Sequence, residues 1–73
     1  SENELASESF PATIKEYYLK NFPDEKGYKV WEVENEAGTK TYYSPVKDAV
    51  IFFDKDGKFI RREERTPENM EQK

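Results

Sequence analysis

The feature that most constrains this chain is its densest apolar stretch, AVIFFDKDGKFI at residues 49–60. The DKDG segment in its middle is typical of a type I turn closed by a glycine with positive φ. We therefore expect a β-hairpin in which Phe53 faces Phe59 and Phe52 faces Ile60. Because side chains alternate across a strand, both faces of this hairpin are apolar, and each face needs a cover.

Length and composition restrict what can supply those covers. The 73 residues make one domain, and a chain of this size buries only about 60% of its extended surface. Charged residues reach 38% of the sequence, but the 5 Phe, 5 Tyr and 1 Trp can each bury a large area. The sequence therefore predicts a small folded core with polar ends.

Several classes of function are disfavoured by the composition. The chain has no Cys and no His, which excludes disulfides, thiolate chemistry and zinc sites of the Cys/His kind, and removes the commonest general base. The net charge of −4 argues against nucleic acid or an anionic membrane as a partner. No apolar run approaches the roughly 18 residues of a membrane span, so we expect no membrane insertion.

The one helical pattern lies at residues 10–22. Pro11 suits the first position of a helix, Ser9 suits the N-cap before it, and Pro23 ends the helix. At 100° per residue, five apolar side chains fall on one stripe that is typical of a core-facing helix: Phe10, Ile14, Tyr17, Tyr18 and Phe22. Residues 1–9, SENELASES, are polar and acidic, which indicates a flexible lead.

Two strands are expected between the helix and the apolar hairpin. The first covers residues 28–34, and the NEAG turn after it would pair Trp31 with Tyr43. Pairing should stop near Pro45, which cannot donate to a ladder. A four-residue loop in this connection would place Tyr43 opposite Val50, whereas a three-residue loop would exchange the two faces of the sheet.

The predicted fold class is α+β, with one N-terminal helix packed on a four-stranded antiparallel meander. The expected organisation is a flexible lead at residues 1–9, a folded domain at 10–64 and a disordered tail at 65–73. A single helix covers only one face of such a sheet.

Four segments of this domain resemble the PepSY-like family, which is also described as beta-lactamase-inhibitor-like. Phe10-Pro11 opens the helix, Phe22-Pro23 ends it, Tyr42-Tyr43 lies in a strand, and Phe53-Asp54 precedes Gly57 and Phe59 in the last hairpin. The resemblance covers residues 10–64, and the strand interruption at Pro45 departs from it. It implies a helix with four strands, often in tandem copies, in a protein exported to the periplasm or cell envelope of bacteria of the Bacteroides type. It implies no catalytic residues.

The resemblance also assigns the two faces of the sheet. It places Ile51, Phe53 and Phe59 under the helix. It leaves Val50 and Ile60 on the open face, together with Trp31, Tyr43 and Phe52. Exposed aromatic patches of this kind are typical of protein contact surfaces. We therefore expect a non-enzymatic module that binds a protein through these last three residues, in the manner of a hydrolase or peptidase inhibitor. The alternative is a structural half-unit that pairs with a second copy of the domain.

The carboxylates of the apolar hairpin indicate no further chemistry. Asp54 and Asp56 begin like a calcium loop, but the later ligands of such a loop are missing. Paired carboxylates catalyse reactions only in a cleft that shifts their pKa values, and a small meander leaves little room for one. We therefore expect no metal site, no cofactor and no catalytic residues.

Overall fold

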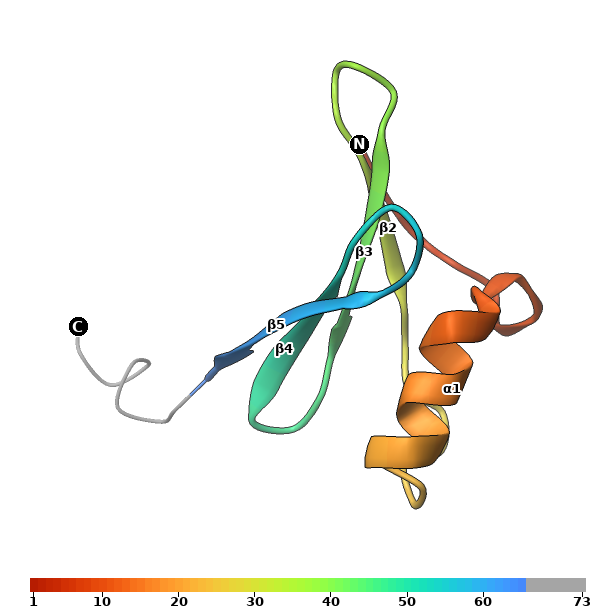
Figure 1. The fold of residues 1–73 in the computed structure, drawn as a ribbon, viewed down its shortest axis with the longest axis vertical. Helices are drawn as coiled ribbons and strands as arrows, with labels where there is room; N and C mark the ends of the chain where they lie inside the picture. Colours follow the sequence, from red (N-terminus) through yellow and green to blue (C-terminus); the bar gives the residue numbers. More distant parts are fainter. Residues whose placement is uncertain (66–73) are drawn as a thin grey trace.

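A computed structural model describes residues 1–65 of the chain. These residues form an α+β fold of one α-helix and a five-stranded antiparallel sheet. The elements are β1 (Glu2–Glu4), α1 (Ala12–Asn21), β2 (Trp31–Glu34), β3 (Lys40–Pro45), β4 (Ala49–Phe53) and β5 (Phe59–Glu64). The strands lie in the sheet in chain order, β1-β2-β3-β4-β5 (Figure 1). The predicted fold class is confirmed, with one strand more than expected.

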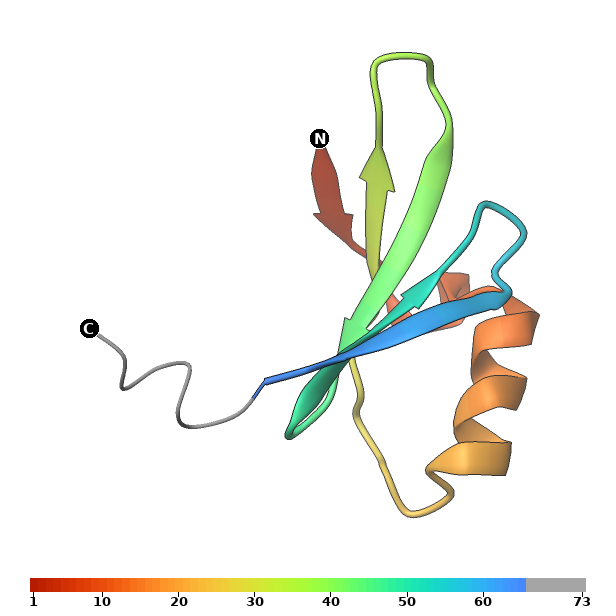
Figure 2. The ribbon, with the colours of Figure 1, turned by 60° about the vertical axis from the view of Figure 1, so that its left-hand side comes forward.

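The additional strand is β1, at the edge of the sheet beside β2 (Figure 2). Its register pairs Glu2 with Val33 and Glu4 with Trp31. The prediction of a flexible lead at residues 1–9 is therefore wrong. Strand β1 is paired with β2, and Leu5, the residue after β1, donates its N–H to the Val30 carbonyl and packs against the core.

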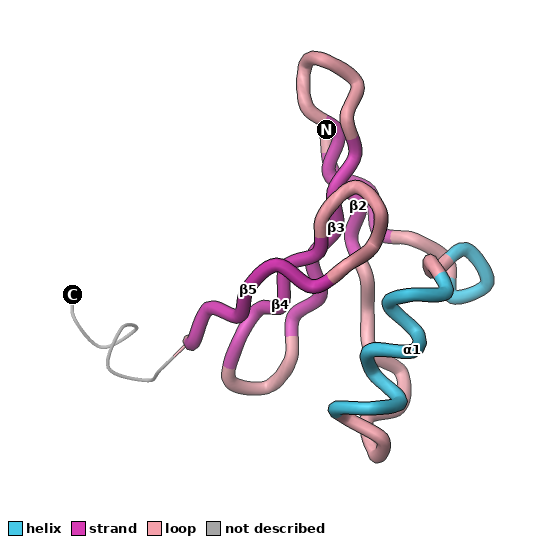
Figure 3. Tube along the Cα trace, in the orientation of Figure 1, coloured by secondary structure: helices cyan, strands magenta, loops and turns pink. Residues whose placement is uncertain are grey.

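The helix is shorter than predicted at its start. α1 begins at Ala12, Pro11 takes the N-cap position, and Ser9 belongs to a preceding 3-10 turn, so Ser9 is not the cap. At the other end the Phe22 N–H donates to the Tyr18 carbonyl, and Pro23 follows. The segment from there to β2 has no regular secondary structure, so the strand expected at residues 28–34 begins only at Trp31 (Figure 3).

The core lies between α1 and one face of the sheet. Its fully buried members come from both sides of that interface: Ile14, Tyr18, Val30, Ile51 and Phe53. The other predicted stripe residues of the helix (Phe10, Tyr17 and Phe22) pack around this cluster. The buried hydroxyl of Ser44 bonds both the Tyr18 hydroxyl and the Lys29 carbonyl, which satisfies these polar groups away from water. The helical stripe and the covered sheet face are thus confirmed.

Two of the hairpin turns have the same construction. In each, an Asx side chain accepts hydrogen bonds from the backbone two and four residues later, as Asp54 does from Asp56 and Lys58 at 2.9 Å. Asn35 makes the same pair of bonds in the turn between β2 and β3. The expected pairing of Trp31 with Tyr43 follows and is confirmed.

The connection between β3 and β4 differs from the prediction. Tyr43 lies opposite Phe52 and not opposite Val50, and Pro45 belongs to the strand. The Val46 N–H donates to the Ala49 carbonyl across a two-residue loop. Because hydrogen-bonded and non-hydrogen-bonded pairs alternate along an antiparallel ladder, Pro45 and Val50 form a non-hydrogen-bonded pair, and the nitrogen of Pro45 points away from β4. It points toward the β2 side, where pairing has already ended. The register is displaced by two residues, and an even displacement leaves the faces unchanged.

A β-bulge separates the two ends of the β4–β5 hairpin. Phe53 lies opposite Phe59 as predicted, but Phe52 lies opposite Arg61, so the expected pairing of Phe52 with Ile60 is wrong. Ile60 is the additional residue at the bulge and is 47% exposed. The bulge therefore brings an arginine, and not an isoleucine, next to Phe52.

The predicted tail begins at Arg65, which the structure still describes. The Arg65 N–H donates to the Asp48 carbonyl at 2.7 Å, and its guanidinium donates to the Val46 carbonyl at 2.7 Å. Residue 65 is thus attached to the β3–β4 loop. The rest of the predicted tail, residues 66–73, lies outside the described part of the chain.

Candidate functional site

The face of the sheet opposite α1 carries one continuous row of side chains across all five strands. The registers place Glu4, Trp31, Tyr43, Phe52 and Arg61 successively opposite one another from β1 to β5. We call these five residues the cross-strand row. It begins with an acid at one edge of the sheet, ends with a base at the other, and has three aromatic rings between them.

The rings of the cross-strand row contact one another. Trp31 and Tyr43 stack with centroids 6.2 Å apart and planes within 8°, and Tyr43 meets Phe52 at 6.2 Å with a tilt of 42°. The Arg61 guanidinium lies over the Phe52 ring, 4.1 Å from its centroid, which is a cation–π contact. Because each ring shields the next, Trp31, Tyr43 and Phe52 are only partly exposed.

A hydrogen bond ties the centre of the row to the added strand. The Tyr43 hydroxyl donates to Glu2 Oε1 at 2.8 Å, and this bond raises the pKa of Tyr43. The side chain of Tyr43 is thereby held across β2. β1 therefore does not cover the open face but extends it and orients its central ring.

The structure brings the three predicted site residues together on one face, partly exposed, while the neighbouring Ile51 and Phe53 of β4 are fully buried beneath α1. Among residues 1–65, α1 is the only α-helix, and it lies on one side of the sheet (Figures 1 and 2). Sequence reasoning missed Glu4 and Arg61. No sequence signal identified either one, because their positions depend on β1 and on the bulge.

Phe59 needs a partial correction. It was expected under the helix, and it does stack on Tyr17 of α1 with centroids 5.4 Å apart. It is nevertheless 48% exposed, because it lies on the edge strand β5. Phe59 thus closes the margin of the core and is not part of the cross-strand row.

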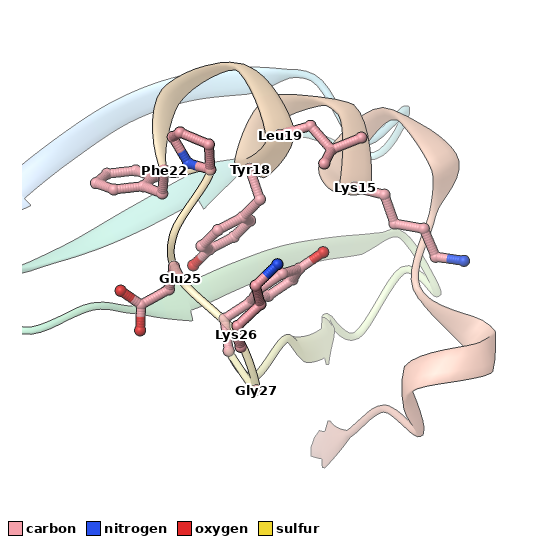
Figure 4. A pocket seen from close by; sticks show the side chains of 9 residues that line it. Lys15, Tyr18, Leu19, Phe22, Glu25, Lys26 and Gly27 are labelled. Carbon is pink, nitrogen blue, oxygen red and sulfur yellow. The ribbon is translucent and has the colours of Figure 1, made fainter.

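A second candidate is a groove between α1 and the loop that follows it (Figure 4). Its volume is about 320 Å³, at the lower end of the range for small-molecule pockets. Its lining includes Tyr18 and Tyr28, which stack on each other, and also Lys15, Leu19 and Lys26. Its charged groups, Lys15, Glu25 and Lys26, are exposed and have no hydrogen-bond or ion-pair partner in the described part of the chain that forms the groove, so they supply no preorganised recognition geometry.

The Asp54 carboxylate has structural partners in its own turn. Asp54 accepts two backbone hydrogen bonds within its turn, and the bond from the Lys58 N–H is the main cause that lowers its pKa. Within residues 1–65, no group of three or more Asp or Glu side chains is placed to hold a metal ion. Of the two carboxylates that resembled the start of a calcium loop, Asp54 bonds the backbone of the hairpin turn and Asp56 pairs with the neighbouring Lys55.

No helix among the described residues is both long enough and apolar enough to cross a membrane. Comparison of the chain with protein-family models, with curated proteins and with solved structures found no match. The resemblance to the PepSY-like family therefore stays a prediction.

Proposed function

We propose that this chain is a non-enzymatic protein-binding domain that uses the open sheet face as its contact surface. The observation that carries the proposal is the cross-strand row, in which a Trp, a Tyr, a Phe and an Arg lie side by side on a sheet face opposite the helix. Trp, Tyr and Arg are the residue types that most often dominate binding energy at protein interfaces.

The geometry of the row supports a protein rather than a small molecule as the partner. The rings form a continuous ridge that follows the sheet across β2, β3 and β4, whereas a small ligand needs a concave site. Val33, Pro45 and Val50 lie beside the ridge on the same face and are also partly exposed. Apolar surface flanked by charged residues matches the core-and-rim arrangement of protein interfaces.

The composition of the chain supports a binding role rather than catalysis. The sequence contains neither His nor Cys, and among residues 1–65 the carboxylate with a shifted pKa, Asp54, is hydrogen-bonded within its own turn. We further propose, from the resemblance at residues 10–64, that the domain belongs to the PepSY-like family and is exported to the bacterial periplasm or cell envelope. Its partner would then be a protein of the envelope, either a foreign one such as a hydrolase or peptidase or a second copy of the domain.

The test compares the wild-type chain with a variant carrying Trp31→Ser and Phe52→Ser. Each chain is immobilised and exposed to an envelope extract of the source organism, and captured proteins are crosslinked and their contacts mapped by mass spectrometry. We expect crosslinks around β2, β3 and β4 with the wild type and loss of capture with the double variant. Leu19→Ser is the matched control, because Leu19 is 72% exposed on α1, away from the open face.

Circular dichroism of all three chains separates binding from folding. If the double variant folds and still captures the same proteins, the open face is not the contact surface and the proposal is wrong. If the double variant does not fold, single substitutions of Trp31 and Phe52 by Ala repeat the comparison with a smaller loss of apolar area.

A further inference from the structure

Two ion pairs border the open face, one at each margin. At the β1 side, the Lys29 ammonium lies 3.6 Å from a Glu4 carboxylate oxygen. At the β5 side, Arg61 Nε lies 2.8 Å from a Glu63 carboxylate oxygen. All four side chains are substantially exposed, so each pair is accessible to a partner that approaches the face.

The two ion pairs have acid and base in opposite order along the strands. In the cross-strand row, Glu4 at one margin corresponds to Arg61 at the other. The neighbouring row pairs Pro45 with Val50 and Val50 with Glu63. Continuing the β2–β3 register by two residues brings Lys29 alongside Pro45, where the Ser44 hydroxyl bonds the Lys29 carbonyl. One row thus runs from acid to base across the sheet, and the next runs from base to acid.

This arrangement of charges is complementary to itself. Consider two copies whose open faces meet, related by a two-fold axis parallel to the strands. This axis places the β1 margin of one sheet over the β5 margin of the other, and each row of side chains over the same row of the other copy. Glu4 of one copy then faces Arg61 of the other. Lys29 continues β2, so its backbone lies over Val50 of the other copy, and its ammonium, which extends to 3.6 Å from Glu4 at the β1 margin, approaches Glu63. Both contacts occur twice, as in any isologous interface. An axis that coincides with the cross-strand row would instead place Glu4 on Glu4 and Arg61 on Arg61, which is repulsive. An axis midway between the two rows would bring Glu4 over Lys29 of the other copy, but it would set the rings over the neighbouring row and not over one another.

We propose that the partner of the open face is a second copy of this chain, docked face to face about a two-fold axis parallel to the strands. The inference rests on the proposed function, because it uses the same surface. In this dimer Tyr43 lies over its own copy, and Trp31 lies over Phe52 of the other chain. Sheets packed this way lie about 10 Å apart at roughly 30°, which the long Arg and Lys side chains can span.

The sheet edges are poorer docking sites than the face. β5 is an edge strand whose residues are all exposed, but it carries the charged run Arg61–Glu64 and the bulge at Ile60. Charged side chains and bulges are the devices that prevent edge-to-edge pairing. β1 has only three residues, two of them Glu. The face, with its paired charges, is therefore the surface suited to a second copy.

The area of the face determines how tight this dimer can be. Five strands about 4.8 Å apart and two full rows of side chains give a footprint of about 19 Å by about 14 Å, and the shorter row of Glu2, Val33 and Thr41 raises it to roughly 330 Å². A stable interface buries about 800 Å² on each partner. The dimer is therefore weak and reversible, and its dissociation must be followed at protein concentrations from about 10 μM to about 1 mM.

Sedimentation equilibrium of two charge-reversal variants, Arg61→Glu and Glu4→Arg, tests the geometry. Each variant alone places like charges opposite each other in both symmetric contacts, so we expect its dissociation constant to rise about tenfold or more above that of the wild type. An equimolar mixture restores both contacts, because each reversed residue then faces its oppositely charged partner. The mixture should associate as the wild type does. Arg62→Glu, on the helix side of β5, is the matched control and should leave the dissociation constant unchanged.

Three results would overturn the inference. The first is a wild-type chain that stays monomeric up to about 1 mM. The second is self-association that neither reversal weakens, which would place the interface elsewhere. The third is a mixture that associates no better than the single variants. If the wild type is monomeric but captures a foreign protein through Trp31 and Phe52, the proposed function stands and only the second copy is excluded.

Discussion

Substitution of Gly57 by Ala should destabilise this domain more than the same change at its other glycines. Gly57 ends the β4–β5 turn with φ +76°, and the turn packs on the start of α1. A Cβ at this position would overlap Thr13 Oγ1 and lie 3.4 Å from Pro11 Cβ. The position therefore requires glycine for both its backbone conformation and its space.

Two other glycines isolate the contribution of the backbone. Gly27 and Gly38 also have positive φ, at +72° and +87°, but a Cβ at Gly27 would meet nothing within 4 Å, and one at Gly38 would meet only Glu34 Oε2 at 3.9 Å. Their Ala variants should lose about 1 kcal/mol each, the cost of a left-handed Ala less its entropy gain in the unfolded chain. Overpacking adds about 1–3 kcal/mol at Gly57.

Rotation of Thr13 limits this additional cost. Turning its χ1 angle moves Oγ1 away from the new methyl group, at the expense of the 3.4 Å hydrogen bond to the Asp56 carbonyl. The Pro11 contact remains tight, so we expect the lower half of the range, and Gly57→Ala should lose about 2–3 kcal/mol in total. Urea unfolding of the three Ala variants measures the differences. Gly57→Ala should lose less free energy of unfolding in a chain that already carries Thr13→Ala than in the wild type, because the Thr13 hydroxyl that the new methyl group meets is then absent. Equal losses at all three glycines would refute the packing of this turn on the helix.

Three further predictions concern polar groups. Asp54→Asn should keep the turn at pH 7 but make the domain less sensitive to acid. Backbone hydrogen bonding, led by the Lys58 N–H, lowers the pKa of Asp54 in the folded state. The carboxylate therefore stabilises the fold above its unfolded pKa of about 4, and this stabilisation is lost as pH falls through the lower folded pKa. Urea unfolding at pH 7 and in acid should therefore show a smaller drop for the variant than for the wild type. Ser44→Ala should lower the free energy of unfolding by about 1–3 kcal/mol, because it leaves the buried Tyr18 hydroxyl and the Lys29 carbonyl without their partner. The double variant Ser44→Ala/Tyr18→Phe should lose less than the sum of the two single losses, because both changes remove the same hydrogen bond. Burial raises the pKa of Tyr18, so its contribution is complete below pH about 10 and falls at higher pH, and Tyr18→Phe should reduce the alkaline loss of stability measured by thermal unfolding.

The division of side chains between the two sheet faces was predictable, although one register was not. The β3–β4 pairing differs from the expectation by two residues, and an even displacement preserves which side chains point to the helix. Trp31, Tyr43 and Phe52 therefore share the open face in either register. The loop at Lys47 and Asp48 lacks the glycine or asparagine that marks most two-residue hairpins, so nothing in the sequence indicated its length.

The strand β1 could not have been predicted from its own residues. Glu2, Asn3 and Glu4 are all polar and exposed, without the alternation that marks a half-buried strand. What orders them is the free edge of β2 together with Leu5, which packs on the core. The acid of the cross-strand row at Glu4 is consequently a product of tertiary pairing, which a local pattern does not contain.

The position of Arg61 in the row depends on the bulge at Ile60. Nothing in the charged run RREE that follows Ile60 indicates such a bulge. A regular ladder would place Ile60 opposite Phe52 and Glu63 opposite Ala49, where the bulged ladder places Arg61 and Glu64. Because residues 61–64 are all charged, no alternation of apolar and polar side chains marks which of them faces the helix. The charges alone therefore cannot select the register, and a covalent test is needed.

Pairs of introduced cysteines distinguish the two registers of β5. The Ala49 carbonyl accepts its hydrogen bond from β3, so Ala49 and Glu64 form a non-hydrogen-bonded pair with Cα atoms about 4.5 Å apart, within the range for a disulfide. Ala49→Cys with Glu64→Cys should oxidise to an intramolecular disulfide, whereas Ala49→Cys with Glu63→Cys should keep free thiols, because residue 63 points to the opposite face. The natural chain has no cysteine, so a thiol titration after mild oxidation reads the outcome directly. Oxidation of the residue 63 pair in place of the residue 64 pair would mean a regular ladder, which removes Arg61 from Phe52 and ends the charge complementarity proposed for two copies of the open face.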